Sequence, residues 1–423
     1  MKTRSTLLLL AASTMLTACV DNALDGDRTI EVNKVAELSV PASFDWRLSN
    51  AVTCNTTSPK PTLVSVSIGE NEEPFASFYV GNGAAPATLN LPTAVKTLFV
   101  SYQTATGVSK AQSVSVNNAA MTFAVGDDCT MPLAVAKTSA FGAIDFNTEN
   151  GVVYVPAKKS GWGTVLFEDL WPSYGDYDFN DMVANYKIQF YLDAQNAVEA
   201  MQFGVRVKAV GGSLPYDLYL QLPNLAANLI GDVEVISPST AGTAIVQIPT
   251  TNRACFRFDG MRNKNVADGS AYFNTEYGHE IPEANMVELY VVVYFTESVA
   301  LDKLTSSAPD FFIAKKDAND QIAKEIHCRD FEPVNQPLYE EIMNASKTPI
   351  THWYYSAESN LVWGLNIPKN IQHIYEAQNF PKEKEYGDFL KAYPQFKEWA
   401  ESGGVKNPDW YVHGVKSLLV KEL

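Results

Sequence analysis

The sequence predicts a mainly β fold with two tandem antiparallel β-sandwich domains, the second of which ends in a short helical segment. Three patterns support this fold class. Short alternating or apolar runs, separated by Pro, Gly and Asn, recur between about residues 35 and 135. Longer β-rich runs separated by turn residues follow between residues 182 and 296. Apolar residues take clear helical spacing only within residues 384–405.

The chain begins with MKTRSTLLLLAASTMLTAC, in which basic Lys2 and Arg4 precede an apolar run and small residues. This pattern is typical of a secretory signal peptide, here residues 1–18. The ending LTAC resembles a bacterial lipobox, which implies that Cys19 becomes the lipid-bearing first residue of the mature chain. The alternative is a signal peptide that merely ends beside a cysteine. Val20 is not the acidic residue that usually signals inner-membrane retention, so the outer membrane is favoured, facing either the periplasm or the exterior.

The mature chain divides into a tether and two domains. Residues 19–34 are polar and aperiodic, and they predict a tether between the lipid and the first domain. The first sandwich is expected at residues 35–135, where runs such as TLVSVSI, TLFVSY and QSVSVN alternate with turn residues. The small-residue stretch PLAVAKTSAFGAIDF separates it from the second domain, residues 145–423. No later stretch approaches the roughly 20 apolar residues of a helical span, so we expect the lipid to be the membrane anchor.

The C-terminal helical segment carries its own break. In KEYGDFLKAYPQFKEWAESGGV, apolar residues recur at helical spacing. Pro394 cannot sit inside a continuous helix, so we expect a short helix, a kink near Tyr393 and a second helix with Pro394 in its first turn. Gly403 and Gly404 supply the end of the second helix.

Charge and cysteine content exclude some partners and suggest a redox state. The formal net charge is -16, so nucleic acid is a poor candidate partner. Export places the cysteines that follow Cys19 in an oxidising compartment, where two disulfides become possible. The domain division pairs Cys54 with Cys129 and Cys255 with Cys328. Four buried free thiols are the alternative.

Acidic residues concentrate in LFEDLWPSYGDYDFNDMVANYKIQF, residues 166–190, where no Lys or Arg precedes Lys187. Clustered carboxylates repel one another in a partly buried setting, and a divalent cation would relieve this repulsion. The candidate ligands for such a cation are Glu168, Asp169, Asp176, Asp178, Asn180 and Asp181.

Calcium is the cation that this chemistry favours. Asp176, Asp178 and Asn180 have the 1-3-5 spacing with which calcium loops begin, although the EF-hand pattern does not continue, since Asp181 and Lys187 replace its Gly and Glu. Carboxylate and amide oxygens without a nearby His or Cys prefer Ca²⁺ over zinc or copper. If the stretch DYDFN is extended, its oxygens point one way and its aromatic rings the other. The alternative is that these residues cap turns and bond backbone amides.

The segment FEDLWPSYGDYDFNDMV also resembles the signature of the LruC-type domain of bacterial surface lipoproteins. FDGMRNKN, YFNTEYG, DFFIAKKDANDQIAKEIHCRDFEPVN, KEYGDFLKAYPQFKEWAESGG and NPDWY resemble later parts of that family, so the resemblance covers residues 145–423. Upstream, SFDWRLSNAVTCN looks like the β module that often precedes this domain. The resemblance implies a surface lipoprotein, and a related motif in another family of exported β domains adds to the calcium hypothesis. EIHC places Cys328 where we expect an apolar residue, which leaves the second disulfide without family support.

Catalysis is disfavoured by the same residues. Paired carboxylates such as Glu168 with Asp176 could act as acid and base on a glycosidic bond, but glycosidases hold two carboxyls apart across a cleft, and these lie in one short segment. No HExxH, GxSxG or P-loop pattern occurs. We therefore predict that the protein is not an enzyme. The histidines are scattered and are expected to be surface or core residues: His279, His327, His352, His373 and His413.

Aromatic residues gather in THWYYSAESNLVWGLNIP, which contains His352, Trp353, Tyr354, Tyr355 and Trp363. Exposed rings bind sugars by stacking, whereas buried rings fill a core, and the core interpretation is favoured. Two functions therefore remain. The first is a structural or adhesive surface lipoprotein with a calcium-stabilised β domain, whose partner is a glycan or a surface protein. The alternative is a carbohydrate-binding module of a surface glycan system.

Overall fold

The computed structural model describes residues 34–81, 83–131, 151–236, 244–247, 253–262, 272–346, 350–356, 358–376 and 388–421. Residues Asn33–Leu423 form one compact unit. The predicted signal peptide, Cys19 and nearly all of the tether lie outside the described residues, as does the predicted domain boundary at 135–145. In the described part of the chain, no helix is long and apolar enough to cross a membrane.

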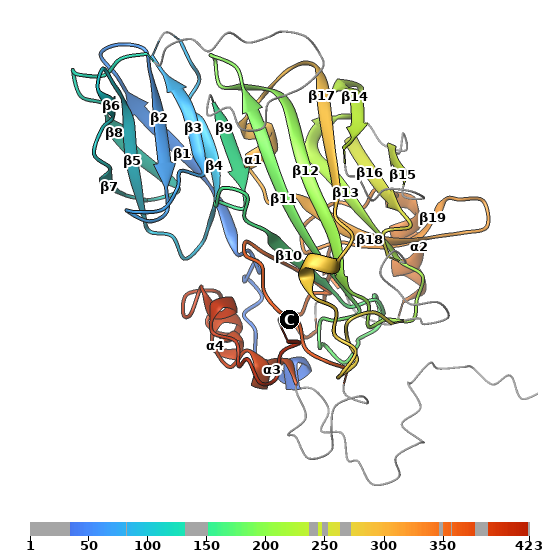
Figure 1. Cartoon of the computed structure of the whole chain (residues 1–423). Helices are drawn as coiled ribbons and strands as arrows, with labels where there is room; N and C mark the ends of the chain where they lie inside the picture. The colour runs from blue at the N-terminus through green and yellow to red at the C-terminus, as the bar shows by residue number, and fades with distance from the viewer. Residues whose placement is uncertain are drawn as a thin grey trace, which may run out of the picture. The chain divides into compact units, whose positions relative to one another are not determined.

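Among the described residues up to 125, the structure contains eight strands, which Figure 1 labels. They are β1 (Ser49–Thr57), β2 (Thr62–Ser67), β3 (Ala76–Val80), β4 (Ala87–Pro92), β5 (Thr97–Thr104), β6 (Gly107–Val108), β7 (Gln112–Ser115) and β8 (Ala120–Ala124). One layer is the sheet β4-β1-β8, in which β1 and β8 are parallel. The other layer contains β3, β2 and β5, with β6 and β7 both paired to β5. Apolar side chains from the inner faces form the core between the layers, which is the arrangement of a small β-sandwich.

The second group of strands also forms two layers. Its long strands are β11 (Met182–Leu192), β12 (Ala197–Ala209) and β17 (Leu289–Ala300), flanked by β9 (Val152–Val155), β10 (Gly163–Phe167), β14 (Ile230–Val235) and β22 (Gly364–Ile367). The facing five-stranded sheet has the order β15-β16-β13-β18-β19. Its strands are β13 (Asp217–Ala226), β15 (Ala244–Gln247), β16 (Arg253–Asp259), β18 (Asp310–Lys316) and β19 (Ile322–Ile326). Phe203 on β12 contacts Phe256 and Phe258 on β16, with ring centroids 5.9 and 5.7 Å apart, so the two layers share one core.

The mainly β fold with short C-terminal helices is confirmed, and one feature of the sheets was not predicted. Strand β3 pairs antiparallel with β9, matching Ala76 with Val153 and Ser77 with Val152. This pairing joins strands of the two predicted domains into one large sheet with the order β14-β17-β12-β11-β9-β3-β2-β5-β6. The division at residues 135–145 therefore stays a prediction.

Short helices and turns complete the fold. They are η2 (Lys34–Glu37), η3 (Ala227–Leu229), η4 (Glu283–Asn285), α1 (Asp302–Thr305), α2 (Gln336–Ala345), α3 (Phe389–Ala392), α4 (Gln395–Glu401) and η6 (Trp410–Val412), with a small hairpin of β20 (Ile350–His352) and β21 (Tyr355–Ser356). Helix α3 ends before Tyr393, so the predicted break is present, and Pro394 is the N-cap residue of α4 instead of lying in its first turn. Gly403 and Gly404 follow α4 with φ of 64° and 82°, the left-handed conformation that ends helices.

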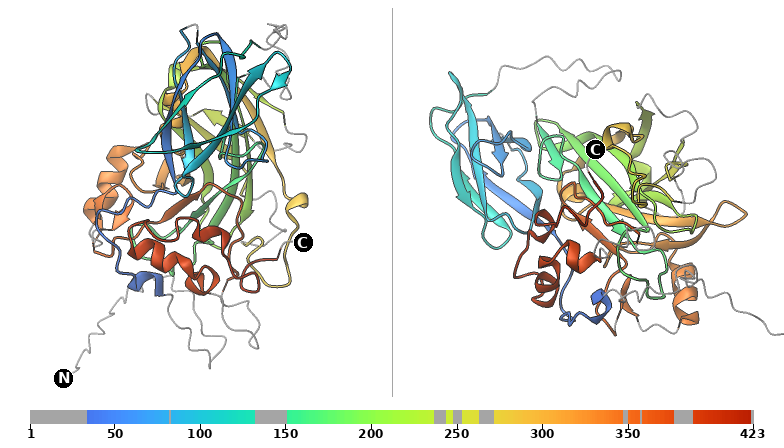
Figure 2. Two further views of the ribbon diagram at one scale, coloured as in Figure 1. Left: turned by 90° about the vertical axis from the view of Figure 1, so that its left-hand side faces the viewer. Right: turned by 60° about the horizontal axis from the view of Figure 1, so that its bottom comes forward.

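An aromatic cluster joins the two ends of the described chain. We define the second core as the buried cluster that contains Phe44, Trp46, Phe389, Phe396, Trp399 and Trp410 with their apolar neighbours. The Phe44 and Trp399 ring centroids are 4.9 Å apart in an edge-to-face arrangement. Figures 1 and 2 show the N-terminal stretch lying beside α3 and α4. The residues that follow the tether are therefore packed against the C-terminal helices.

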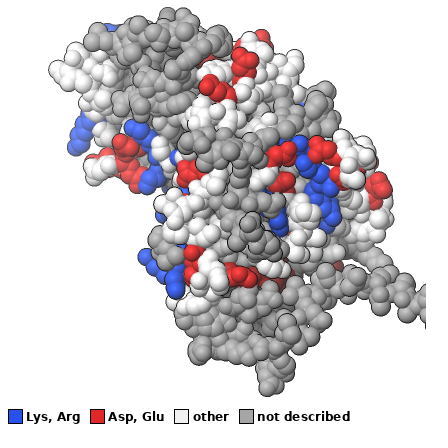
Figure 3. All heavy atoms as spheres, turned by 45° about the vertical axis from the view of Figure 1, so that its right-hand side comes forward, with Lys and Arg blue, Asp and Glu red and all other residues white. Residues whose placement is uncertain are grey.

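Surface charges are mixed on the face shown in Figure 3, where acidic and basic side chains of described residues lie close together. Ion pairs also bring opposite charges together: within β16, Arg257 Nε lies 2.8 Å from Asp259 Oδ1, and at the end of β18, Lys316 Nζ lies 2.8 Å from Asp320 Oδ1 in the following turn. Among the described residues on this face, the excess negative charge is not gathered in one patch.

The predicted disulfides are wrong, because Cys54, Cys129, Cys255 and Cys328 are all free and buried. Cys255 packs with Tyr219 and Phe312 in a separate small cluster, whereas Cys328 belongs to the main core. Cys129 Sγ lies 3.4 Å from the Ser58 hydroxyl. The four residues behave as small apolar side chains in the core, which was the alternative drawn from the sequence.

Candidate metal centre

The acidic segment connects β10 to β11, which are antiparallel neighbours. Residues 168–181 between them form a loop instead of a tight hairpin. The loop begins beside β22, where the Glu168 backbone N–H donates to the Trp363 carbonyl at 2.9 Å. The ends of the loop are thus fixed by the sheet, and its side chains are held against the domain.

The expectation that DYDFN is extended is wrong. Tyr177 and Phe179 have φ of 57° and 56°, in the left-handed region that aromatic residues rarely adopt. Alternating left-handed residues still separate the side chains as predicted. Both rings are buried in the second core, where Phe179 lies 5.0 Å from Phe389 between ring centroids. The intervening oxygens of Asp176 and Asp178 lie together outside that core.

Glu168 supports this unusual backbone. Its side chain is fully buried, and its two carboxylate oxygens accept hydrogen bonds from the backbone N–H groups of Phe179 at 2.7 Å and Tyr177 at 3.2 Å. Hydrogen bonds to a charged acceptor stabilise by about 1.5–3 kcal/mol each. One buried side chain therefore fixes both left-handed residues of the loop.

Three carboxylates converge in this loop. Glu168, Asp176 and Asp178 each place an oxygen within 4.8 Å of the others. Glu168 and Asp178 are buried, whereas Asp176 reaches the surface. Burial and the Asp176 carboxylate raise the pKa of both buried groups well above their ordinary values. Without a cation, the fold therefore opposes ionisation of these residues.

A second pair of carboxylates adjoins the first group. The Asp169 backbone N–H donates to Asp181 Oδ2 at 2.8 Å, and burial raises the pKa of Asp169 to about 6, although Lys324 and Arg262 oppose this rise. Burial and Glu168 raise the pKa of Asp181 well above its ordinary value. A Cβ at Gly212 would lie 2.3 Å from Asp169 Oδ2 and 3.0 Å from Asp181 Oδ1, so a larger residue there would displace these carboxylates.

Asn180 and Glu376 complete the cluster. Asn180 is fully buried, and no donor among the described residues bonds its Oδ1. Its amide nitrogen donates to the Ile374 carbonyl at 3.4 Å. Burial and Asp176 raise the pKa of Glu376 to about 8, whereas a hydrogen bond from Asn180 lowers it. Sequence reasoning missed Glu376, because no local pattern connects it to a loop almost 200 residues earlier.

The donor set suits a hard cation. All six predicted residues, namely Glu168, Asp169, Asp176, Asp178, Asn180 and Asp181, lie in this one loop, and Glu376 adds a further carboxylate. Among the described residues, the group with metal-ligand spacing contains carboxylates alone. Oxygen donors of this kind bind Ca²⁺ at about 2.3–2.6 Å with 6–8 ligands. The residues present fit calcium by ligand type and by their unsatisfied charge.

Comparison with known families decides what kind of chain this is. A family model described as a domain of unknown function, DUF4842, matches residues 196–411, about half of the chain. The chain belongs to the DUF4842 family. The matched region contains Gly212 and Glu376 of the cluster, and the acidic loop precedes it. No curated protein matches the chain.

A solved structure shares the fold of this DUF4842 protein. It is a crystal structure described as a "Putative lipoprotein from Bacteroides ovatus", with a TM-score of 0.64 and 20% sequence identity. The similarity covers 86% of this chain and 100% of that chain. At this identity, the comparison shows a common fold.

The aromatic run predicted from the sequence is part of the core. Tyr354, Tyr355 and Trp363 are 0%, 3% and 0% exposed, so their rings cannot form an open stacking platform. The core interpretation therefore holds for these rings, while the His352 side chain lies outside what the structure describes.

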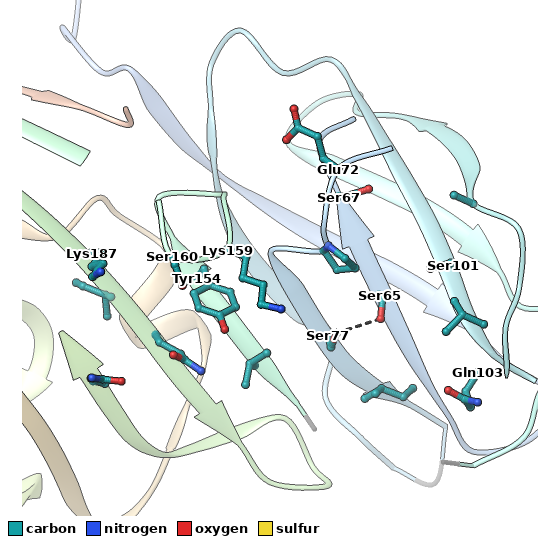
Figure 4. Close-up of a pocket in the computed structure, with 18 of the residues that line it drawn as sticks. Ser65, Ser67, Glu72, Ser77, Ser101, Gln103, Tyr154, Lys159, Ser160 and Lys187 are labelled. Atoms are coloured by element: carbon teal, nitrogen blue, oxygen red, sulfur yellow. Dashed lines mark hydrogen bonds between the residues drawn. The ribbon is translucent and has the colours of Figure 1, made fainter. Parts of the chain in front are cut away.

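A polar groove of about 720 Å³ lies on the large sheet where β3 pairs with β9 (Figure 4). Its lining includes Ser65 on β2, which is directly opposite Ser77 on β3 and Ser101 on β5. The Ser65 and Ser77 hydroxyls are 3.0 Å apart. Across the join, Tyr154 on β9 is opposite Gln189 on β11, whose buried Nε2 has no acceptor among the described residues. The groove therefore offers hydroxyl, amide and phenol groups to a ligand.

Proposed function

We propose that this protein is a lipid-anchored protein of the bacterial outer membrane, with a calcium-stabilised β domain that has a structural or adhesive role. The signal-like N-terminus with Cys19, the resemblance to LruC-type domains and the fold likeness to a described lipoprotein support this proposal. The crowding of the carboxylates in one loop favours a structural role for them over catalysis.

One observation carries the calcium proposal: Glu168, Asp176 and Asp178 place oxygens within 4.8 Å of one another, and the same loop holds a buried Asn180 oxygen that lacks a donor among the described residues. The alternative, in which these residues only cap turns, does not explain this Asn180 oxygen. A cation between the oxygens would offset the repulsion and supply the missing partner. The aromatic residues between the ligands would then keep the loop attached to the domain.

Thermal unfolding of metal-free residues 33–423 with and without calcium tests the proposal. Calcium at a hundredfold excess over Kd stabilises the folded state by about 2.7 kcal/mol, or roughly 3 °C in Tm for a chain of this length. Asp178→Asn should abolish most of this rise. Asp232→Asn, at an exposed position on β14, is the matched control and should respond as wild type does. An equal calcium response in Asp178→Asn would contradict the assignment.

The anchor is tested separately, by replacing Cys19 with Ser in the full chain. The variant should lose its lipid and separate from the outer membrane on fractionation. If Cys19→Ser protein stays with the outer membrane, the lipobox interpretation is wrong.

Carbohydrate binding is a second candidate function, and the polar groove at the β3–β9 join favours it. Sugars are recognised by hydroxyl, amide and aromatic groups, which line this groove. A glycan array probed with residues 33–423 tests the idea. Binding that disappears in Gln189→Ala, and persists in Asp232→Asn, would support it. An array without binding would favour the structural or adhesive role.

A further inference from the structure

The C-terminal region reaches the acidic loop through one side chain. We propose that Glu376 and Asn180 complete the calcium site, so that the ion fastens the C-terminal region to the loop. This inference rests on the proposed calcium binding and adds a ligand from outside the acidic segment. It also gives the ion a structural role, which is to hold the C-terminal region against the loop.

The first support is the geometry around Gly211. A Cβ at Gly211 would lie 2.4 Å from Asn180 Oδ1 and 2.5 Å from Glu376 Oε1, so the two oxygens lie within about 5 Å of each other. Two ligands on opposite sides of one Ca²⁺ are separated by about 5 Å, because each Ca–O distance is about 2.3–2.6 Å. The two oxygens can therefore share one ion, and the glycine leaves the space that they need.

Charge gives the second support. Burial disfavours the charged form of the Glu376 carboxylate, and the like charges of Asp176, Asp169 and Glu276 add to this effect. Buried like charges disfavour the docked position of the segment unless a cation or protons intervene. Asn180 Oδ1, fully buried and without a donor in the described part of the chain, requires a partner at the same place. A cation there would satisfy both groups.

The position of Glu376 connects the site to the end of the chain. Its backbone N–H donates to the Thr275 carbonyl at 3.0 Å. Just before it, Ile374 forms a bridge with Leu419, and the Val420 N–H donates to the His373 carbonyl at 2.9 Å. Fixing Glu376 therefore also restrains residues 419–420.

The loop holds the same region on its other side through Phe179. The Phe179 ring lies 5.0 Å from Phe389 and 6.4 Å from Phe396, between centroids. Helices α3 and α4 carry these two partners, and they also pack against the stretch that follows the tether. An ion that orders the loop consequently stabilises the docking surface for both ends of the described chain.

Calorimetry and hydrogen exchange on residues 33–423 test the inference. Glu376→Gln should weaken calcium binding at least tenfold. Calcium should slow amide exchange in residues 388–421 of wild type, and this protection should disappear in Glu376→Gln. Glu297→Gln removes the same charge at an exposed position on β17, and it should retain wild-type affinity and protection.

The outcomes separate the inference from the proposal on which it rests. Wild-type calcium affinity in Glu376→Gln would overturn the inference and leave the loop site intact. Absence of calcium binding in wild type would overturn both. The Tm of metal-free protein shows whether Glu376→Gln folds correctly. The substitution relieves charge repulsion in the metal-free state, so a correctly folded variant should have a higher Tm than wild type, and a folding defect would lower it. A lower metal-free Tm together with a normal calcium response would also overturn the inference.

Discussion

Replacing His327 by leucine is expected to destabilise the fold more than any exposed histidine substitution. The His327 ring is buried, stacked on Phe312 with centroids 4.0 Å apart. Nδ1 lies 2.9 Å from Asp310 Oδ2, and Nε2 lies 3.1 Å from Glu325 Oε2. Both ring nitrogens therefore face carboxylates, which favours the imidazolium form with two donors. Burial alone would lower the pKa of His327, but Asp310 and Glu325 outweigh it and raise the pKa to about 9.

The size of the effect follows from this pKa. A rise from 6.5 to about 9 corresponds to about 3 kcal/mol of stability at 1.36 kcal/mol per unit. For a histidine whose pKa is raised by folding, this contribution is complete below pH 6.5 and is lost as pH rises through about 9. His327→Leu also leaves Asp310 and Glu325 buried without their cation, and removal of one partner of a buried pair costs about 3–5 kcal/mol.

Urea unfolding of wild type and His327→Leu between pH 6 and pH 9.5 measures the effect. The difference in unfolding free energy should be about 3–5 kcal/mol near pH 6 and should shrink towards pH 9.5. His413→Leu is the control, because His413 is exposed beside Asp409 and should change stability by less than about 1 kcal/mol. A difference that is constant across this pH range would refute the charged state of His327.

Three further predictions concern the cluster and the cysteines. Gly212→Ala should reduce the calcium-induced rise in Tm, because its Cβ would displace the Asp169 carboxylate; an unchanged rise would place that carboxylate outside the site. Metal-free protein should lose stability as pH rises from about 4 through 6 and 8, because folding raises the pKa of Asp169 to about 6 and of Glu376 to about 8. Calcium should remove this pH dependence of Tm in thermal scans. Cys54, Cys129, Cys255 and Cys328 should all be alkylated in urea and none of them in native protein, as measured by mass spectrometry. A disulfide would leave fewer than four thiols to alkylate in urea.

Features with a local pattern were predictable from the sequence. Alternating runs located strands such as β2, β5 and β7, and the proline at residue 394 located the break between α3 and α4. The acidic loop was found because its residues adjoin one another in the chain. The sequence also predicted that the aromatic rings and the oxygens of DYDFN point in opposite directions, but it derived this separation from an extended backbone. Tyr177 and Phe179 adopt left-handed conformations instead, stabilised by hydrogen bonds to Glu168 and by ring packing that no local propensity reports.

Features that depend on distant residues were missed. Glu376 comes near the loop only through the tertiary fold, and nothing in its sequence neighbourhood marks it as a ligand. The pairing of β3 with β9 depends on two strand edges meeting, which alternation within each strand does not specify. The cysteine prediction relied on compartment and domain division, whereas a disulfide requires close, correctly oriented side chains. Cys255 and Cys328 lie in different clusters and do not meet this requirement.

Calcium binding is measured most directly by isothermal titration calorimetry on metal-free residues 33–423. Saturable binding should occur below millimolar calcium, and it should be lost in Asp178→Asn and retained in Asp232→Asn. Magnesium at the same concentration should bind more weakly, because it requires a nearly ideal octahedral site and keeps several waters. If metal-free protein binds no calcium at millimolar concentration, residues 168–181 form only a capped turn and the proposed metal centre does not exist.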